Sequence, residues 1–208
     1  MDTTAPTEDL LSRLLDVIAA DVVPLTREGV ARGNKLFGAA ILRRDDLSLV
    51  VAETNNEVEN PLWHGEIHAI KRFHELPPAG RPASGDTVFL ATHEPCSLCL
   101  SGLAWGGFTE CWYLFSHADS ADAFAIPYDI QILQGVYAVP DPDRAAPAPG
   151  RDLYNRSNPY FTTHDLAAAV RASGDDSLLE RVRTLATTYD ELSATYQSGK
   201  GGHAIPHA

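Results

Sequence analysis

The residues best suited to chemistry are a histidine, a glutamate and two cysteines in two short segments of the chain. His64 and Glu66 are separated by one glycine, and Cys96 and Cys99 follow Pro95 with two residues between them. Catalytic zinc sites use three protein ligands of this kind and leave the fourth tetrahedral position open for water. His64, Cys96 and Cys99 supply such a ligand set. The pattern therefore predicts a zinc site with one open position.

Glu66 is predicted to act on the substrate, not on the metal. Three ligands already satisfy a catalytic site, so this carboxylate is not needed as a fourth. Because it lies just beyond His64, it can reach a water in the open position and move its proton. Together the four residues predict a hydrolytic centre with Zn²⁺ as the cofactor.

Three other kinds of site use similar residues. A lone Cys-x-x-Cys can be a redox pair, although here a His-x-Glu motif stands upstream of it. Zinc proteases carry H-E-x-x-H, in which Glu directly follows the first His, whereas residue 65 is Gly. A structural zinc site needs a fourth ligand, for which His68, His93 or Cys111 is available. These alternatives stay open, but the redox and structural ones leave the glutamate without a role.

Hydrophobic periodicity predicts the elements that position these residues. Residues 65–76 carry a helical pattern that stops at two prolines, and residues 95–105 are predicted as a second helix after a buried strand at residues 87–92. The histidine and the glutamate then sit at the N-terminus of one helix, and both cysteines on the first turn of another. Helix N-termini stabilise anionic groups. Both predicted helix starts therefore suit a site built on thiolates and a carboxylate.

The other periodic segments predict an α/β domain. They lie at residues 9–23, 36–42, 47–52, 110–115, 120–124, 135–139, 165–172 and 178–196. Strands that alternate with helices fit a layered α/β fold. The Pro/Ala-rich segment 141–150 interrupts this pattern. We therefore expect a zinc-dependent catalytic domain over residues 1–140, and an extension over residues 141–208 whose helices pack on the same domain or on a partner subunit.

The composition is that of an acidic globular protein of 208 residues, 44% hydrophobic and 21% charged. No apolar run reaches the roughly 18 residues that cross a bilayer, and the N-terminus lacks a secretory pattern, so we expect a cytoplasmic location without membrane insertion. The net charge of −12 repels phosphate backbones and disfavours a nucleic-acid partner. Three cysteines, two of them in one motif, do not make a disulfide framework.

Residues 10–130 resemble the cytidine deaminase superfamily of zinc deaminases, and within it the nucleobase branch that contains guanine deaminases and yeast-type cytosine deaminase. The shared residues are His64-Gly65-Glu66, Glu94-Pro95-Cys96-Ser97-Leu98-Cys99-Leu100, Phe37-Gly38-Ala39 and an asparagine before the histidine. The resemblance implies a three-layer α/β/α fold with a mixed central sheet of about five strands. It also implies that His64, Cys96 and Cys99 bind zinc and that Glu66 shuttles the proton.

The resemblance further implies a closed pocket for a flat substrate. Asn55 would hydrogen-bond the substrate ring, or Asn56 in its place, because the loop before His64 is a few residues shorter than in the family. The backbone of Gly65 and Glu94 would line the reacting carbon. The predicted substrate-binding residues are Asn55, Phe37, Gly65, Trp63, Glu94 and Trp105.

Two features favour guanine deaminases within this branch: Trp105, in a Cys-Leu-x-x-x-x-Trp setting, and the acidic segment Asp119–Asp129. The predicted function is hydrolytic deamination of a small amino-bearing heterocycle, with release of ammonia and with a purine base or nucleoside favoured as the substrate. Cytosine deamination is the alternative, and a non-catalytic zinc-stabilised interaction module is the alternative from another class. The acidic charge disfavours a tRNA-editing deaminase.

The C-terminal extension is predicted to close the pocket. Aromatic faces and amide groups, as expected of a wall against a flat heterocycle, come together in Tyr154, Asn155, Asn158, Tyr160 and Phe161. The apolar stripe over residues 178–196 would hold this wall in place, in a homodimer. The alternative is a surface crossover whose aromatic residues only anchor the helix behind it.

Overall fold

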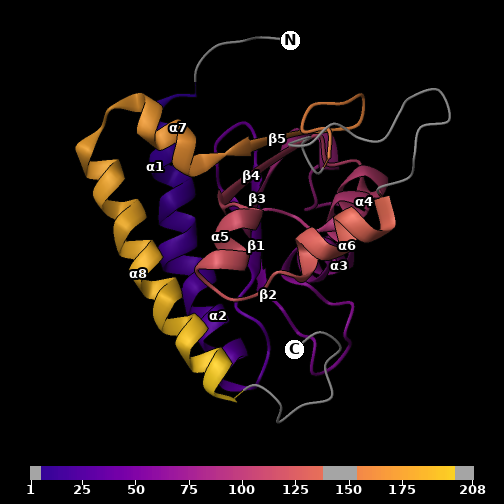
Figure 1. Cartoon of the computed structure of the whole chain (residues 1–208). Coiled ribbons are helices and arrows are strands. Elements are labelled where there is room, and N and C mark those ends of the chain that lie inside the picture. The colour runs from indigo at the N-terminus through magenta and orange to yellow at the C-terminus, as the bar shows by residue number, and fades with distance from the viewer. Residues whose placement is uncertain (1–5, 138–153, 200–208) are drawn as a thin grey trace, which may run out of the picture.

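The chain is built on a mixed five-stranded sheet that carries helices on both faces (Figure 1). The computed structural model describes residues 6–137 and 154–199. The strand order is β2-β1-β3-β4-β5. The strands are β1 (Gly38–Arg43), β2 (Leu49–Thr54), β3 (Thr87–His93), β4 (Glu110–Phe115) and β5 (Thr162–Asp165). β1 pairs antiparallel with β2 and β3, whereas β3, β4 and β5 are parallel, so the predicted mixed sheet in an α/β fold is confirmed.

Helices form the outer layers of the fold. They are α1 (Glu8–Val17), α2 (Val23–Ala31), α3 (Gly65–Glu75), α4 (Ser97–Gly106), α5 (His117–Asp122), α6 (Tyr128–Tyr137), α7 (Leu166–Ser173) and α8 (Asp176–Gly199). A π-helical turn, η1 (Ile18–Val22), joins α1 to α2, and a 3-10 turn, η2 (Ser84–Asp86), precedes β3. Among the described helices, none has both the length and the apolar character needed to cross a membrane.

The period-two alternation of the strands divides the core into two layers. Leu90 and Trp112 face the layer that contains α1, α2, α7 and α8. Their strand neighbours Ala91 and Tyr113 face the layer that contains α3 and α4. Side chains of successive strand residues point to opposite faces, so a sheet buried on both sides needs apolar residues at every position. All residues of β3 are buried, and those between its polar ends, Val88–Ala91, are apolar.

The predicted strand at residues 135–139 is wrong in its described part. Helix α6 continues to Tyr137, and residues 138 and 139 lie outside the described residues. The fifth strand is instead β5, which pairs with Glu110–Tyr113 of β4. The division of the chain at residue 140 also lies outside the described residues and stays a prediction. Because β5 belongs to the part after that division, both parts of the chain contribute to one sheet.

Candidate active site

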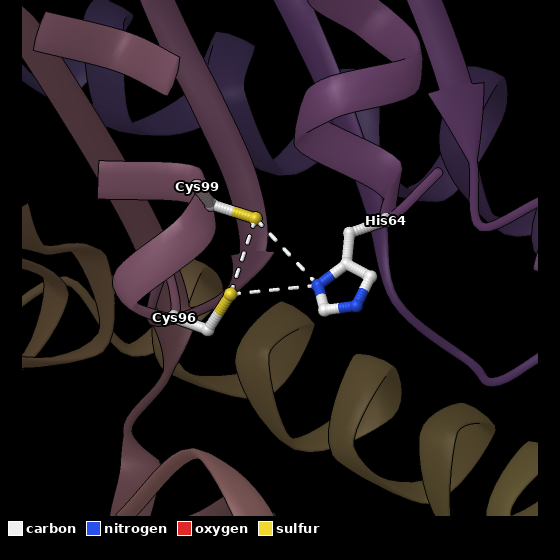
Figure 2. A group of neighbouring side chains, drawn as sticks. All are labelled: His64, Cys96 and Cys99. Atoms are coloured by element: carbon white, nitrogen blue, oxygen red, sulfur yellow. Dashed lines mark hydrogen bonds between the residues drawn. The ribbon is translucent and has the colours of Figure 1, made fainter. Parts of the chain in front are cut away.

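The three predicted metal ligands converge where α3 and α4 begin (Figure 2). His64 Nδ1 lies 3.4 Å from Cys96 Sγ and 3.7 Å from Cys99 Sγ. The two sulfur atoms lie 3.4 Å apart. All the ligand atoms therefore lie close enough to share one ion.

The spacing and chemistry of this group fit zinc. Tetrahedral zinc has Zn–S bonds of about 2.3 Å and Zn–N bonds of about 2.0 Å, which places ligand atoms roughly 3.5 to 3.8 Å apart. The observed separations differ from this range by a few tenths of an ångström at most. Two thiolates with one imidazole are also a donor set that zinc prefers. His64, Cys96 and Cys99 would hold the ion.

Two chain segments deliver these ligands from opposite sides. His64 is the N-cap of α3, and Cys96 is the N-cap of α4, both in extended backbone conformation. Cys99 lies on the first turn of α4, on the same side as Cys96. The positive ends of two helix dipoles thus meet at the ligand group. This arrangement stabilises negative charge on the thiolates.

Gly65 lets the start of α3 approach β1. A Cβ atom at position 65 would lie 2.8 Å from Gly38 Cα and 3.0 Å from the Phe37 carbonyl oxygen, both of them backbone atoms. The Gly65 N–H also donates a 2.5 Å hydrogen bond to Asn55 Oδ1. The glycine is therefore required here by close packing beside His64.

We expect Gly65→Ala to destabilise the protein by about 1 to 3 kcal/mol, because the added methyl group meets rigid backbone and forces it to move. Gly85→Ala is the matched control, since nothing lies within 4 Å of a Cβ atom at that position. It should change the free energy of unfolding by less than about 0.5 kcal/mol. Urea unfolding of both variants measures the difference. Equal stabilities would show that the close approach of α3 to β1 does not constrain residue 65.

The ligands perturb one another's pKa values. The pKa of Cys96 lies well below its usual range, because of its hydrogen bond with Cys99 and its contact with His64. Burial alone would lower the pKa of His64, but the Cys96 sulfur raises it to about 9. Burial, followed by the neighbouring Cys96, raises the pKa of Cys99. The site therefore favours an anionic Cys96, and a binding cation competes with the protons on the other two ligands.

Glu66 lies in the first turn of α3, with 6% of its surface exposed. Burial and the nearby Cys96 raise the pKa of its carboxyl to about 7, and it also makes a hydrogen bond with Cys99. A carboxyl with a pKa near neutrality can both accept and give up a proton. Its location and acidity suit the predicted proton shuttle.

The possible fourth ligands of a structural zinc site lie elsewhere in the described part of the chain. His68 Nδ1 is 3.0 Å from the Thr54 carbonyl oxygen. His93 packs against the rings of Phe37 and Phe124, and burial lowers its pKa to about 3. Cys111 is buried in β4. The group of possible metal ligands within the described residues contains only His64, Cys96 and Cys99.

The two asparagines proposed for substrate binding differ in environment. Asn55 is fully buried, and its side chain accepts a hydrogen bond from Gly65 and donates one of 2.9 Å to Glu57 Oε2. Asn56 carries its side chain on the surface, where Nδ2 donates a 2.7 Å hydrogen bond to Glu59. The structure therefore places Asn55, and not Asn56, against the start of α3. Contact with a substrate stays a prediction for either residue.

The structure separates the three aromatic residues predicted to bind substrate. Phe37 is buried beside Gly65 and packs edge-on against His93 at 4.6 Å between ring centroids. Trp63 precedes the metal ligand, but its ring stacks on His68 and lies under the Lys71 ammonium. Trp105 is 93% exposed on α4. Trp105 is therefore not brought to the ligand group within this chain.

Glu94 anchors the C-terminal segment beside the site. Its Oε1 accepts hydrogen bonds of 2.9 Å from the Tyr154 hydroxyl and from Arg156 Nη2. Its Oε2 accepts a 3.0 Å hydrogen bond from the His117 backbone N–H. The carboxylate is 1% exposed, so these partners satisfy a buried charge. One residue of the predicted wall, Tyr154, thus reaches the chain two residues before Cys96, whereas another, Tyr160, is 69% exposed.

Sequence reasoning missed three charged residues next to the site. Lys35 and Glu57 form a buried ion pair of 2.8 Å. Asp129 lies on the first turn of α6, where burial and the Cys96 thiolate raise its pKa to about 7. Asp129 falls in the acidic segment that the resemblance singled out, so a signal existed for it. For Lys35 and Glu57 no motif marks the residues as part of a site.

Comparison with known proteins identifies the central region of the chain. Residues 18–115 match the family described as the cytidine and deoxycytidylate deaminase zinc-binding region. The matched segment contains all three ligands and Glu66. A search of curated proteins gives no match to this sequence.

Solved structures resemble the chain at low sequence identity. A protein in complex with 2,6-diaminopurine is 18% identical, with a TM-score of 0.50 over 95% of this chain and 94% of that protein. Guanine deaminase from Nitrosomonas europaea is 19% identical, with a TM-score of 0.48 over 92% of this chain and 86% of that protein. Guanine deaminase from Bacillus subtilis is 23% identical, with a TM-score of 0.48 over 74% of this chain and 99% of that protein. The likeness to the first of these proteins is one of fold alone.

Proposed function

Because residues 18–115 match the cytidine and deoxycytidylate deaminase zinc-binding region, we propose that this protein hydrolytically deaminates a small amino-bearing heterocycle and releases ammonia. The observation that carries the proposal is the convergence of His64, Cys96 and Cys99 with a buried carboxyl, Glu66, in contact with one of the cysteines. A purely structural zinc site has no need for such a carboxyl. A hydrolytic site needs it as an acid and base.

Glu66 supplies the proton transfers in this reaction. Bound zinc would activate a water for attack on the ring carbon that carries the amino group. The Glu66 carboxylate takes a proton from that water and passes it to the adjacent ring nitrogen. A second proton then goes to the amino group as the carbon–nitrogen bond breaks. The water oxygen becomes the ring carbonyl oxygen, and the nitrogen leaves as ammonia.

We propose a purine base or nucleoside of the guanine type as the substrate. Asp129 supports this choice, because it lies on the first turn of α6, which packs against α4, the helix that carries both cysteine ligands at its start. A carboxylate accepts hydrogen bonds from the N–H groups that an aminopurine presents along one edge. The predicted homodimer and cytoplasmic location stay predictions within this proposal.

The substrate class is tested by incubating the zinc-loaded protein with amino-bearing rings and measuring ammonia. The panel contains guanine, adenine, their nucleosides, cytosine, cytidine and an aminotriazine. We expect ammonia from a purine base or nucleoside. Ammonia from cytosine alone would replace this substrate with the alternative one. A fully zinc-loaded protein that releases no ammonia from any ring would instead support the zinc-stabilised interaction module.

A further inference from the structure

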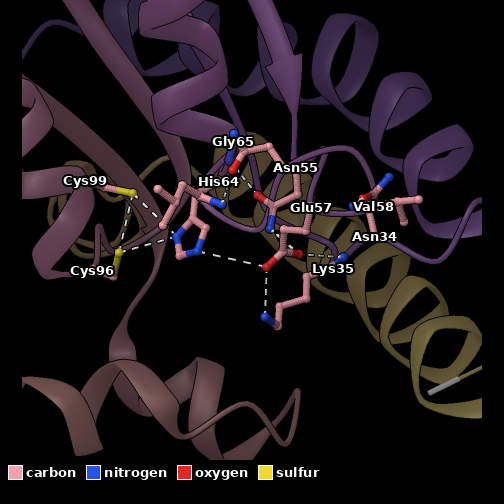
Figure 3. A network of polar contacts seen from close by, with 11 residues as sticks. Asn34, Lys35, Asn55, Glu57, Val58, His64, Gly65, Cys96 and Cys99 are labelled. Atoms are coloured by element: carbon pink, nitrogen blue, oxygen red, sulfur yellow. Dashed lines mark hydrogen bonds and ion pairs between the residues drawn. The ribbon is translucent and has the colours of Figure 1, made fainter. Parts of the chain in front are cut away.

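We propose that Glu57 is a positioning residue that orients both the zinc ligand His64 and the buried amide of Asn55, with its charge balanced by Lys35. Figure 3 shows these side chains as one network beside the cysteines. The role depends on the zinc site of the proposed deaminase, but not on which substrate is deaminated. Its test therefore reads metal binding and not turnover.

Glu57 is a buried carboxylate with several partners. Its side chain is 1% exposed, and that of Lys35 is 8% exposed. Oε1 lies 2.8 Å from the Lys35 ammonium, and Oε2 accepts a 3.2 Å hydrogen bond from the Lys35 backbone N–H. A buried charge is stable only when it is paired and hydrogen-bonded. Lys35 thus fixes a negative charge at a defined place in the interior.

The Glu57 carboxylate lies beside the edge of the His64 ring that is remote from the two cysteine sulfur atoms. The ring turns Nδ1 toward the two sulfur atoms and Nε2 toward Glu57, whose Oε1 lies 3.9 Å away (Figure 3). The distance is too long for a hydrogen bond, so the interaction is electrostatic. It favours the tautomer that carries its proton on Nε2 and leaves the Nδ1 lone pair free for the metal. Carboxylates that accept a hydrogen bond from the second ring nitrogen of a ligating histidine raise metal affinity, and Glu57 lies in the direction of that nitrogen.

The same carboxylate fixes the start of α3. Oε2 accepts the 2.9 Å hydrogen bond from Asn55 Nδ2, and Asn55 Oδ1 accepts from the Gly65 N–H. Glu57 therefore constrains the ligand through its ring and through the backbone that follows it. An ion pair needed only to close the loop would explain the contact with Lys35. It would not explain why Nε2 and the Asn55 amide face the same carboxylate.

The test compares Glu57→Gln with Glu59→Gln by zinc competition against a chromogenic chelator. Glu59 lies exposed in the same loop, and its carboxylate accepts a hydrogen bond from the half-buried Asn56 amide. We expect Glu57→Gln to weaken zinc binding by about 10- to 100-fold and Glu59→Gln to leave it unchanged. The visible absorption of the cobalt-loaded protein should also change in the first variant only, because it reports the geometry of the ligands.

A second variant separates positioning from folding. Glu57→Gln leaves a buried ammonium unpaired and can impair folding, whereas Lys35→Met combined with Glu57→Gln removes both charges. We expect this double variant to fold and still to bind zinc about 10-fold or more weakly than wild type. Wild-type zinc affinity in the folded double variant would overturn the proposal and reduce the pair to a support of the fold. Zinc loss with no ammonia release from the wild-type protein would leave the inference standing while refuting the proposed function.

Discussion

Glu66→Gln should lower the rate of deamination by about a thousand-fold while the protein keeps its zinc. Glutamine has nearly the shape of glutamate, so it fills the same buried volume, but its amide cannot transfer a proton. The three ligands remain in place, because none of them is replaced. Ammonia release under single-turnover conditions, together with zinc content, measures both parts of the result.

Glu75→Gln is the matched control for this experiment. Glu75 lies at the other end of α3, where it pairs with Lys71 and Arg72 on the surface. Its replacement should leave the rate and the zinc content unchanged. A rate near that of wild type for Glu66→Gln would mean that another group moves the proton. Loss of zinc in that variant would mean that the carboxylate is a ligand.

The metal ligands could be predicted from the sequence because the signals for them are local. A histidine before an amphipathic helix and two cysteines at the start of another helix define where each side chain begins. Each ligand follows from a helix start, and helix starts depend on neighbouring residues. What local sequence does not predict is that the two helix starts lie next to each other, because this depends on the tertiary fold. The parallel pairing of β3 with β4 and the packing of α3 on α4 bring the two helix starts together.

The network around Glu57 could not be predicted from the sequence, because the role of Glu57 depends on contacts with residues that are distant in the chain. In the sequence Glu57 is one of several polar residues in a loop, and Lys35 lies 22 positions earlier. Nothing local distinguishes it from Glu59, which is exposed. Strand β5 posed the same difficulty, since its four residues have no apolar alternation and only pairing with β4 makes them a strand.

Trp105 has the spacing from Cys99 that the resemblance led us to expect, but this spacing does not determine where its side chain points. An α-helix turns by about 100° per residue, so six residues place Trp105 roughly 120° around α4 from Cys99. Cys99 faces the ligand group, and Trp105 is 93% exposed. A motif that spans more than one helical turn can therefore agree with a family in sequence while its last residue points elsewhere.

Cys99→Ala should abolish tight zinc binding and, with it, much of the stability that zinc confers. Two remaining ligands cannot hold the ion as three do, and binding to the folded state alone stabilises a protein by an amount that grows with the logarithm of the affinity. A ligand present at a thousand times its Kd contributes about 4 kcal/mol, which corresponds to roughly 8 to 16 °C in Tm for a chain of this size. We therefore expect the variant to melt about 10 °C or more below the zinc-loaded wild type.

Cys111→Ala tests whether this effect comes from the metal. Cys111 is as deeply buried as Cys99, but it lies in β4 and outside the ligand group. Its replacement should lower Tm through lost packing and leave the zinc content intact. Chelation should then lower the Tm of wild type and of Cys111→Ala by similar amounts, and should leave Cys99→Ala unchanged, because that variant has no bound metal to lose. Full zinc occupancy in Cys99→Ala would contradict the ligand assignment, and a chelator response in that variant equal to that of wild type would contradict it as well.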